Sequence, residues 1–174
     1  MSRPLVTPTR RERFFEPDEI IVSKTDPKGV ITYANSVFLR IAGYTEDEIL
    51  GQSHNIVRHP DMPRCVFKLL WDTIAAGKEI FAYVLNMAKN GDHYWVFAHV
   101  TPTFDAEHHI IGYHSNRRVP EAGPKQACTD LYQLLLAEEK KHSSPKDGIE
   151  ASLAMMTALL KDKGIGYDEF VFSL

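Results

Sequence analysis

Cysteine is scarce in this chain, which has only two among its 174 residues, Cys65 and Cys128. They lie too far apart for a CxxC metal or redox pair, and they indicate neither a disulfide scaffold nor an oxidising compartment. An excess of charge of either sign is also missing, because 20 Lys and Arg oppose 23 Asp and Glu and leave a formal net charge of −3. This balance argues against a nucleic-acid binder that depends on a broad basic surface.

Long hydrophobic runs are absent as well. The longest nearly apolar stretch, residues 153–160, is far too short to span a bilayer. The N-terminus is positively charged, but it lacks the apolar segment that completes a signal peptide. We therefore expect a cytoplasmic protein without membrane insertion. Since 44% of the residues are hydrophobic, the chain can still bury a proper core.

Patterns that carry catalysis or bind metal ions are missing too. No P-loop, Ser-His-Asp arrangement or pair of carboxylates stands out, so we expect neither an enzyme nor a catalytic residue. Seven of the eight histidines lie between residues 54 and 114, yet HExxH, HxH and Cys/His sets with zinc spacing do not occur. His93 and His99 are about 20 Å apart on one expected strand, and His108 and His109 lie in an expected loop. We predict no metal site.

The periodicity of the central part of the chain predicts an α+β fold. We expect strands over residues 19–24, 30–34 and 110–117, two long strands on either side of residues 89–92, short helices over 36–42 and 45–51, and a longer helix over 63–76. Asn90-Gly91 is a strong hairpin signal, and Pro63 suits the first turn of a helix. Together these elements predict an antiparallel five-stranded sheet with short helices on one face.

Both faces of the expected sheet carry apolar side chains. Tyr94 and Val96 point to one face, and Trp95 and Phe97 point to the other. An antiparallel sheet normally leaves one face in contact with water. The second face must therefore be covered by the C-terminal tail, by the N-terminal arm or by another subunit.

Composition divides the chain into three parts. Residues 1–18 contain three prolines and several arginines and are predicted to form a flexible N-terminal arm. Residues 120–126 and 142–148 have the Pro, Gly and Ser content of linkers. They separate a body over residues 19–119 from a helical tail over residues 120–174.

The tail has apolar residues at helical spacing around residues 131–135 and 149–160. Two interpretations stay open: these helices pack on the body or on each other, or they form a dimer or partner surface. The last segment, residues 167–174, alternates like a strand that docks onto a sheet edge.

Three motifs give the body a resemblance to a known family. The pattern Gly43-Tyr44-Thr45-x-x-Glu48-x-x-Gly51 is followed by HNIVRHPDMP at residues 54–63 and by KNGDHYWV at residues 89–96. In this order and spacing they resemble the flavin-binding PAS domains of the bacterial aerotaxis receptor family. The resemblance covers roughly residues 19–118 and implies a PAS sensor domain over residues 19–119.

The PAS pocket of that family holds FAD non-covalently and reports the redox state of the cell, and the resemblance implies the same here. The cofactor-binding residues that it implies are Asn35, Arg58, His59, Asp61, Trp71 and Asn86. An isoalloxazine needs an apolar slot, aromatic contact and a few placed polar groups. The pyrophosphate of FAD favours an arginine near the mouth of the pocket.

Each of these residues also has a purely structural explanation. Asn35 fits the N-cap of the following helix, and Trp71 fits the apolar core. Asn86 fits a strand residue that is hydrogen-bonded by the backbone or by water. Residues 58–61 fit a turn before the long helix, with Asp61 as its cap.

Light-sensing LOV domains, which also bind flavin, place a reactive cysteine in the helix after the position of Gly51. The corresponding residues here are Gln52-Ser53-His54-Asn55, so we do not expect a LOV-type flavin adduct. Receptors of the aerotaxis family continue into a membrane anchor and a long signalling region, and the 174 residues of this sequence contain neither.

We therefore expect a stand-alone redox or oxygen sensor, or a signalling adaptor, that binds FAD and transmits the flavin redox state through protein contact. The expected partners are chemotaxis or two-component signalling proteins, not nucleic acid, and the expected assembly is a homodimer. The alternatives are a haem-binding PAS gas sensor with a pocket histidine as axial ligand, a flavoenzyme, and a cofactor-free dimerisation module.

Overall fold

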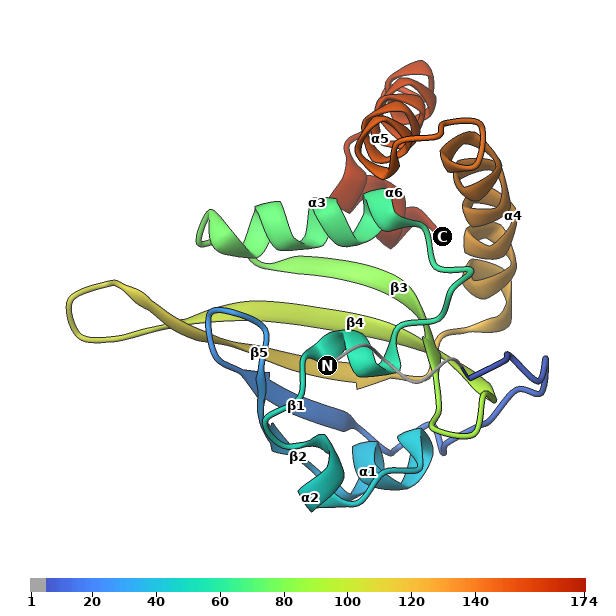
Figure 1. Cartoon of the computed structure of the whole chain (residues 1–174). Coiled ribbons are helices and arrows are strands. Elements are labelled where there is room, and N and C mark those ends of the chain that lie inside the picture. Colours follow the sequence, from blue (N-terminus) through green and yellow to red (C-terminus); the bar gives the residue numbers. More distant parts are fainter. Residues whose placement is uncertain (1–5) are drawn as a thin grey trace.

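The computed structural model describes residues 6–174, and Figure 1 shows its elements. The strands are β1 (Ile21–Thr25), β2 (Ile31–Ala34), β3 (Ile80–Met87), β4 (His93–Phe104) and β5 (Ile110–Arg118). They form one antiparallel sheet of five strands in the order β2-β1-β5-β4-β3. The predicted α+β architecture is confirmed. β1 lies beside β5, so the ends of the body meet in the middle of the sheet.

Short helices fill the connection between β2 and β3. They are α1 (Ser36–Ala42), α2 (Glu46–Ile49), the 3-10 helix η1 (His54–Val57) and α3 (Arg64–Ala75). Asn35 caps α1, which ends at Gly43 with a φ of 72°, a left-handed conformation that glycine adopts without strain. Glu48 Oε2 accepts a hydrogen bond from the Thr45 amide at 3.0 Å, as the capping-box pattern before α2 predicts.

The two faces of the sheet are covered by different parts of the chain. The inner face, which carries Asn86, Ala98 and Arg117, packs against helices that precede β3. The outer face, which carries Trp95 and Phe97, is covered by two tail helices, α4 (Ala122–Glu139) and α6 (Tyr167–Ser173), while the third, α5 (Pro145–Asp162), packs beyond them; all three are seen at the upper right of Figure 1. The sequence allowed the tail, the N-terminal arm or another subunit to cover this face, and the tail is its main cover.

Aromatic contacts attach the tail to the outer face. Tyr132 of α4 stacks on Trp95 with ring centroids 6.0 Å apart and donates a hydrogen bond from its hydroxyl to the Tyr83 carbonyl at 2.5 Å. Phe172 of α6 lies edge-on to Phe81 at 4.8 Å. α5 packs against both α3 and α4, and it therefore links the helices of the two faces.

Three predictions about the tail were wrong. The predicted linkers at residues 120–126 and 142–148 contain the first turns of α4 and α5. Pro124 and Pro145 lie in those first turns, where a missing amide hydrogen breaks no bond within the helix. The segment predicted as a strand is instead the helix Tyr167–Ser173. Its apolar residues Tyr167, Phe170 and Val171 also fit a helical stripe, because so short a segment satisfies both the strand and the helix period.

The arm runs along the β3–β4 hairpin over its described residues, 6–18. The Thr9 amide donates to the Gly91 carbonyl at 3.0 Å, and the Arg13 amide donates to the His93 carbonyl at 2.7 Å. Asp92 accepts hydrogen bonds from the Thr9 hydroxyl at 2.5 Å and from Arg13 Nε at 3.3 Å. Lys125 of α4 contacts Glu12 at 2.9 Å and so joins the arm to the tail.

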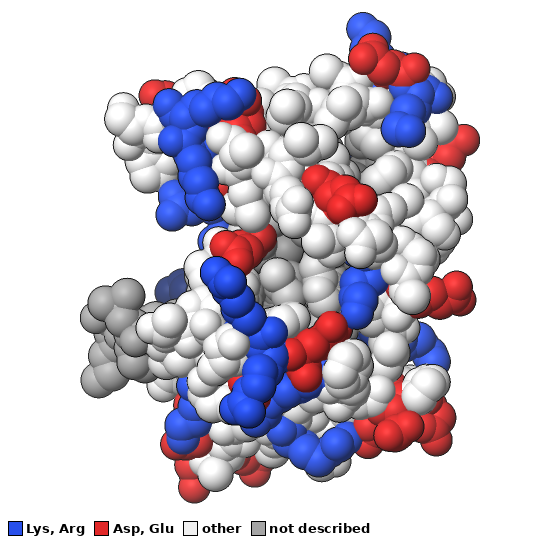
Figure 2. Space-filling model, turned by 90° about the vertical axis from the view of Figure 1, so that its right-hand side faces the viewer, with Lys and Arg blue, Asp and Glu red and all other residues white. Residues whose placement is uncertain are grey.

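Charges of both signs alternate over the side of the molecule that carries the tail (Figure 2). In the described part of the chain, no helix combines the length and the apolar character that crossing a membrane requires.

Candidate functional site

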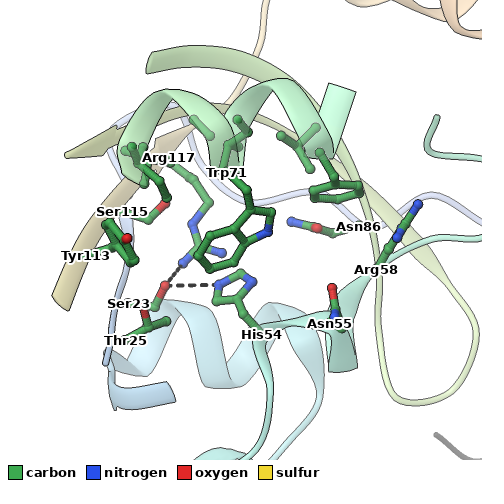
Figure 3. Close-up of a pocket in the computed structure, with 16 residues that line it drawn as sticks. Ser23, Thr25, His54, Asn55, Arg58, Trp71, Asn86, Tyr113, Ser115 and Arg117 are labelled. Carbon is green, nitrogen blue, oxygen red and sulfur yellow. Dashed lines mark hydrogen bonds between the residues drawn. The ribbon is translucent and has the colours of Figure 1, made fainter. Parts of the chain in front are cut away.

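A cavity of about 70 Å³ lies between the inner face of the sheet, η1 and α3. Figure 3 shows the side chains that surround it. They are Ser23, Thr25, His54, Asn55, Arg58, Phe67, Leu70, Trp71, Ile74, Val84, Asn86, Ala98, Val100, Tyr113, Ser115 and Arg117. Most of the wall is apolar, and the polar groups come from the strands and from η1.

The local periods of strand and helix explain which residues reach the cavity. Alternate residues of a strand share a face, and β5 accordingly contributes Tyr113, Ser115 and Arg117. Residues of a helix share a face at spacings of three and four, and α3 contributes residues 67, 70, 71 and 74. The cavity thus lies where the inner face of the sheet is opposite one face of α3.

Trp71 lies across the cavity in Figure 3. Its indole lies edge-on to Tyr113 at 5.6 Å and rests on Gly29 in the β1–β2 turn. A Cβ atom at Gly29 would lie 2.8 Å from Trp71 Cη2, and the φ of Gly29 is 79°, so both the contact and the turn require glycine. The side chain of Trp71 is half-buried.

A buried polar network crosses the floor of the cavity. Arg117 Nη2 donates a hydrogen bond to Ser23 Oγ, and Ser23 Oγ shares a second hydrogen bond with His54 Nε2 at 3.2 Å. The guanidinium of Arg117 also lies over the ring of Phe38, 4.5 Å from its centroid. Within residues 6–174, Arg117 Nε and Nη1 and the hydroxyl of Thr25 are buried without a hydrogen-bond partner.

The charges of this network are fixed near neutral pH. Burial and the nearby Arg117 lower the pKa of His54 to about 3, so its imidazole is uncharged. Burial lowers the pKa of Arg117 to about 10, so the guanidinium stays protonated. The described residues of the wall include no Asp or Glu. The cavity therefore has a positive interior.

The structure brings three of the six predicted cofactor-binding residues together. Arg58, Trp71 and Asn86 all line the cavity. The guanidinium of Arg58 lies over Phe67 at 4.6 Å, and the backbones of Arg58 and Asn86 form an isolated β-bridge. This bridge holds the HNIVRHPDMP segment against the edge of β3.

Asn35 lies outside the cavity wall. Its side-chain oxygen accepts hydrogen bonds from the amides of Val22 and Phe38, both at 3.0 Å, and its amide group donates to the Ile20 carbonyl at 2.8 Å. These bonds join β1 to the start of α1. The structure therefore places Asn35 as a cap, which is the structural alternative that its position in the sequence allowed.

His59 and Asp61 also lie outside the cavity wall and instead line a groove of about 670 Å³ on the outer side of the sheet. His59 Nδ1 accepts a hydrogen bond from the Asp61 amide at 3.0 Å, and the His59 ring lies edge-on to His93 at 6.0 Å. Asp61 does not cap α3, whose N-cap is Pro63. The HNIVRHPDMP motif thus contributes to two surfaces: Arg58 lines the cavity, whereas His59 and Asp61 line the outer groove.

Sequence reasoning missed the polar network around Arg117. A usable signal existed, because the alternation of the last strand puts Arg117 on the same face as Tyr113 and Ser115. A charged residue that faces a buried layer is unusual unless it is paired. The partner Ser23 could not be inferred, because it depends on the pairing of β1 with β5.

Neither cysteine lines the cavity. Cys65 and Cys128 are buried where α3 and α4 meet the other tail helices, and burial raises the pKa values of their thiols to about 11 and about 12. The Cys65 amide donates a hydrogen bond to Glu139 Oε1 at 3.0 Å. Glu139 therefore caps the first turn of α3 from the end of α4.

One exposed group of potential metal ligands lies at the tip of the β4–β5 hairpin. The ligand atoms of Asp105, Glu107 and His109 lie within 4.8 Å of one another. Asp105 Oδ1 accepts the backbone amides of Glu107 and His109, at 3.0 and 2.8 Å, so this carboxylate shapes the turn. We assign no metal site to it.

Comparison with known proteins identifies the family to which this fold belongs. Residues 31–116 match the family described as PAS fold. This part of the chain is a PAS domain. The PAS domain and its flanks are 40% identical to the aerotaxis receptor of Escherichia coli (strain K12) over 136 residues, which are 78% of this chain and 26% of the receptor. The chain thus spans about a quarter of the receptor that it matches.

Other proteins are similar to this chain at lower identity. The nitrogen fixation regulatory protein of Klebsiella pneumoniae is 27% identical over 103 residues, 59% of this chain and 21% of that protein. The light-state structure of the blue-light photoreceptor Aureochrome1 LOV has a TM-score of 0.53 and 27% identity, covering 69% of this chain and 91% of that chain. The proteins that this domain resembles are thus a receptor, a regulatory protein and a photoreceptor.

Proposed function

We propose that the cavity binds a flavin, FAD, non-covalently and that the PAS domain is a redox or oxygen sensor whose output is a protein contact. The observation that carries this proposal is the cavity itself, whose wall combines the aromatic Trp71, the amide of Asn86 and the buried Arg117. An isoalloxazine offers an apolar ring system with donors and acceptors along one edge. The sequence resemblance to flavin-binding PAS domains indicates the same cofactor.

The residues of the wall suit a flavin chemically, but the cavity is too small to hold one unless a side chain moves. Pockets for ligands of this size measure about 300–1,000 Å³, which is well above the present cavity of about 70 Å³. The ring of Trp71 lies against Gly29, and in this proposal rotation of the ring away from Gly29 supplies part of the missing space. Trp71 then becomes an aromatic wall for the ring, a role in which indole is favourable.

The residues of the chain have separate tasks in this proposal. When bound, the flavin supplies the redox chemistry. Asn86 hydrogen-bonds the polar edge of the ring, Arg58 at the mouth attracts the pyrophosphate, and the apolar side chains of α3 and β4 exclude water. Thr25 offers its hydroxyl, which has no partner among the described residues, as a further hydrogen bond.

A route for the output leads through α3. This helix carries Trp71 at the cavity, and its first turn is capped by Glu139 of α4 through the Cys65 amide. A displacement of α3 that follows a change in the flavin therefore reaches the tail. We propose that the tail passes the change to chemotaxis or two-component signalling proteins. The homodimer stays a prediction, which light scattering tests.

The experiment is an absorption spectrum of the purified full chain, before and after incubation with FAD. A flavin spectrum, with FAD identified by chromatography after the protein is denatured, supports the proposal. Asn86→Leu is expected to weaken flavin binding, whereas the control Asn116→Leu, on the outer face of β5, leaves it unchanged. A protein that stays colourless with FAD contradicts the proposal, and a Soret band indicates the haem alternative.

A further inference from the structure

The outer groove, of about 670 Å³, lies on the opposite side of the sheet from the cavity. The described part of its wall comes from the arm, from β3 and β4, from the HNIVRHPDMP segment and from α4. Its volume falls within the range of about 300–1,000 Å³ that is usual for pockets that bind small molecules. The proposed flavin occupies the inner cavity and leaves this groove unassigned.

The floor of the outer groove is apolar and partly aromatic. Leu85 of β3 and Trp95 of β4 come from the outer face of the sheet, and Tyr132 and Leu136 come from α4. The rings of Trp95 and Tyr132 stack with their centroids 6.0 Å apart. Such a floor favours a ligand with an apolar body, because burial removes that body from water, and an aromatic ring adds contacts with the stacked pair.

Two cationic side chains line the outer groove from different walls. Arg10 comes from the arm, and Lys140 comes from the C-terminal end of α4. Both are exposed, and within residues 6–174 neither side chain has an ion-pair or hydrogen-bond partner. Asp61, whose side chain is 65% exposed, is the one carboxylate among the described lining residues. Two positive charges against one negative charge leave an excess that a ligand with a single negative charge complements.

The backbone at Arg10 is held in an unusual conformation. Its φ is 63°, in the left-handed region that residues other than glycine seldom adopt. Hydrogen bonds on both sides keep it there, because the Thr9 amide donates to the Gly91 carbonyl at 3.0 Å and the His93 amide donates to the Arg11 carbonyl at 2.9 Å. Since strained residues cluster at binding sites, this conformation supports a binding role for Arg10.

We propose that the outer groove binds a small aromatic carboxylate, with its ring on the apolar floor and its carboxylate between Arg10 and Lys140. Thr129 and Gln133 lie one helical turn apart on α4 and add a hydroxyl and an amide to the same wall. The site does not depend on a flavin in the cavity. A ligand that contacts both walls links the arm to α4, and the tail thereby receives an input that is separate from the cavity.

The two tryptophans of the chain locate a bound probe, because Trp71 lines the cavity and Trp95 lines the outer groove. In the isotope-labelled full chain each indole N–H gives one NMR signal, and Trp71→Phe assigns the two signals. The probes are 2-naphthoate, an aromatic carboxylate, and 2-naphthamide, its neutral counterpart. We expect 2-naphthoate to shift the Trp95 signal and to leave the Trp71 signal in place. The amide should bind at least about fourfold more weakly, because it forms neither ion pair.

Three variants test the groups of the wall. Arg10→Gln and Lys140→Gln should each weaken 2-naphthoate binding by about two- to fivefold, the range for an exposed ion pair, and leave the affinity for 2-naphthamide unchanged. Lys141→Gln is the matched control, because Lys141 follows Lys140, is not among the described lining residues and pairs with Glu138 at 2.6 Å. Ala137→Phe places a ring at an exposed position of the wall, so it should abolish binding of both probes while the core stays as it is.

Equal affinities of the wild type for the two probes would overturn the inference, and so would the absence of 2-naphthoate binding. A shift of the Trp71 signal in place of the Trp95 signal puts the probe in the cavity and also overturns it. If Lys141→Gln weakens binding as much as Lys140→Gln, the probe responds to diffuse surface charge, and the groove is not its site. These results leave the proposed function intact, because flavin binding is measured separately by absorption.

Discussion

Tyr132 attaches the tail to the sheet through both a hydrogen bond and ring packing. Substitution by Phe and by Ala distinguishes the contributions of the two to stability. Its hydroxyl donates to the carbonyl of Tyr83 on the edge strand β3, and its ring stacks on Trp95 while only 6% exposed. Tyr132→Phe leaves the packing and removes the bond, which should lower the free energy of unfolding by about 1–2 kcal/mol. Tyr132→Ala removes both, and the expected loss is about 3–5 kcal/mol.

Urea unfolding followed by circular dichroism measures both losses. Leu134→Ala is the control, because Leu134 is on the same helix but 53% exposed, so its removal should change the stability by about 0.5 kcal/mol or less. If Tyr132→Ala is as mild as Leu134→Ala, α4 does not pack on the outer face, and the covering role of the tail is refuted.

Three further predictions concern single groups outside the cavity. Glu139→Ala should lower the free energy of unfolding by about 1–2 kcal/mol in a urea titration, because the Cys65 amide loses its acceptor. Both buried thiols, with pKa values raised to about 11 and about 12, should react with Ellman's reagent at pH 8 far more slowly in the native protein than in urea, and equal rates would contradict their burial. Hydrogen bonds from Thr9 and its other partners lower the pKa of Asp92 from 3.8 to about 2, so this carboxylate stabilises the fold above pH 3.8 and loses its effect as the pH falls towards 2. Asp92→Asn should therefore destabilise the protein at pH 7 and have a much smaller effect near pH 2, as thermal melts at the two pH values would show.

The sheet was predictable because its signals are local. Turn residues such as Asn90-Gly91 and the alternation in the long strands determine where each strand lies and which side chains share a face. The tail was harder to predict. Pro124 and Pro145 are typical of linkers as well as of first helical turns, and only packing against the body decides between the two.

The site was predictable only where the chain itself brings residues to one face. Trp71 and Asn86 follow from helix and strand periods, together with the family resemblance. His59 and Asp61 lie next to Arg58 in the sequence, but the chain crosses the edge of the sheet at this point, so they line the outer groove. That crossing is a tertiary feature that no local pattern encodes.

Titration of the full chain with FAD tests flavin binding in this cavity most directly. The measurement is FAD bound per chain, by equilibrium dialysis, for the wild type and for Ala98→Leu. Ala98 is 3% exposed on β4 and lines the cavity, so a leucine fills the space that the ring requires. We expect one FAD per wild-type chain and little or none for Ala98→Leu with an unchanged circular dichroism spectrum. No binding by the wild type, or equal binding by both, would contradict a flavin site in this cavity.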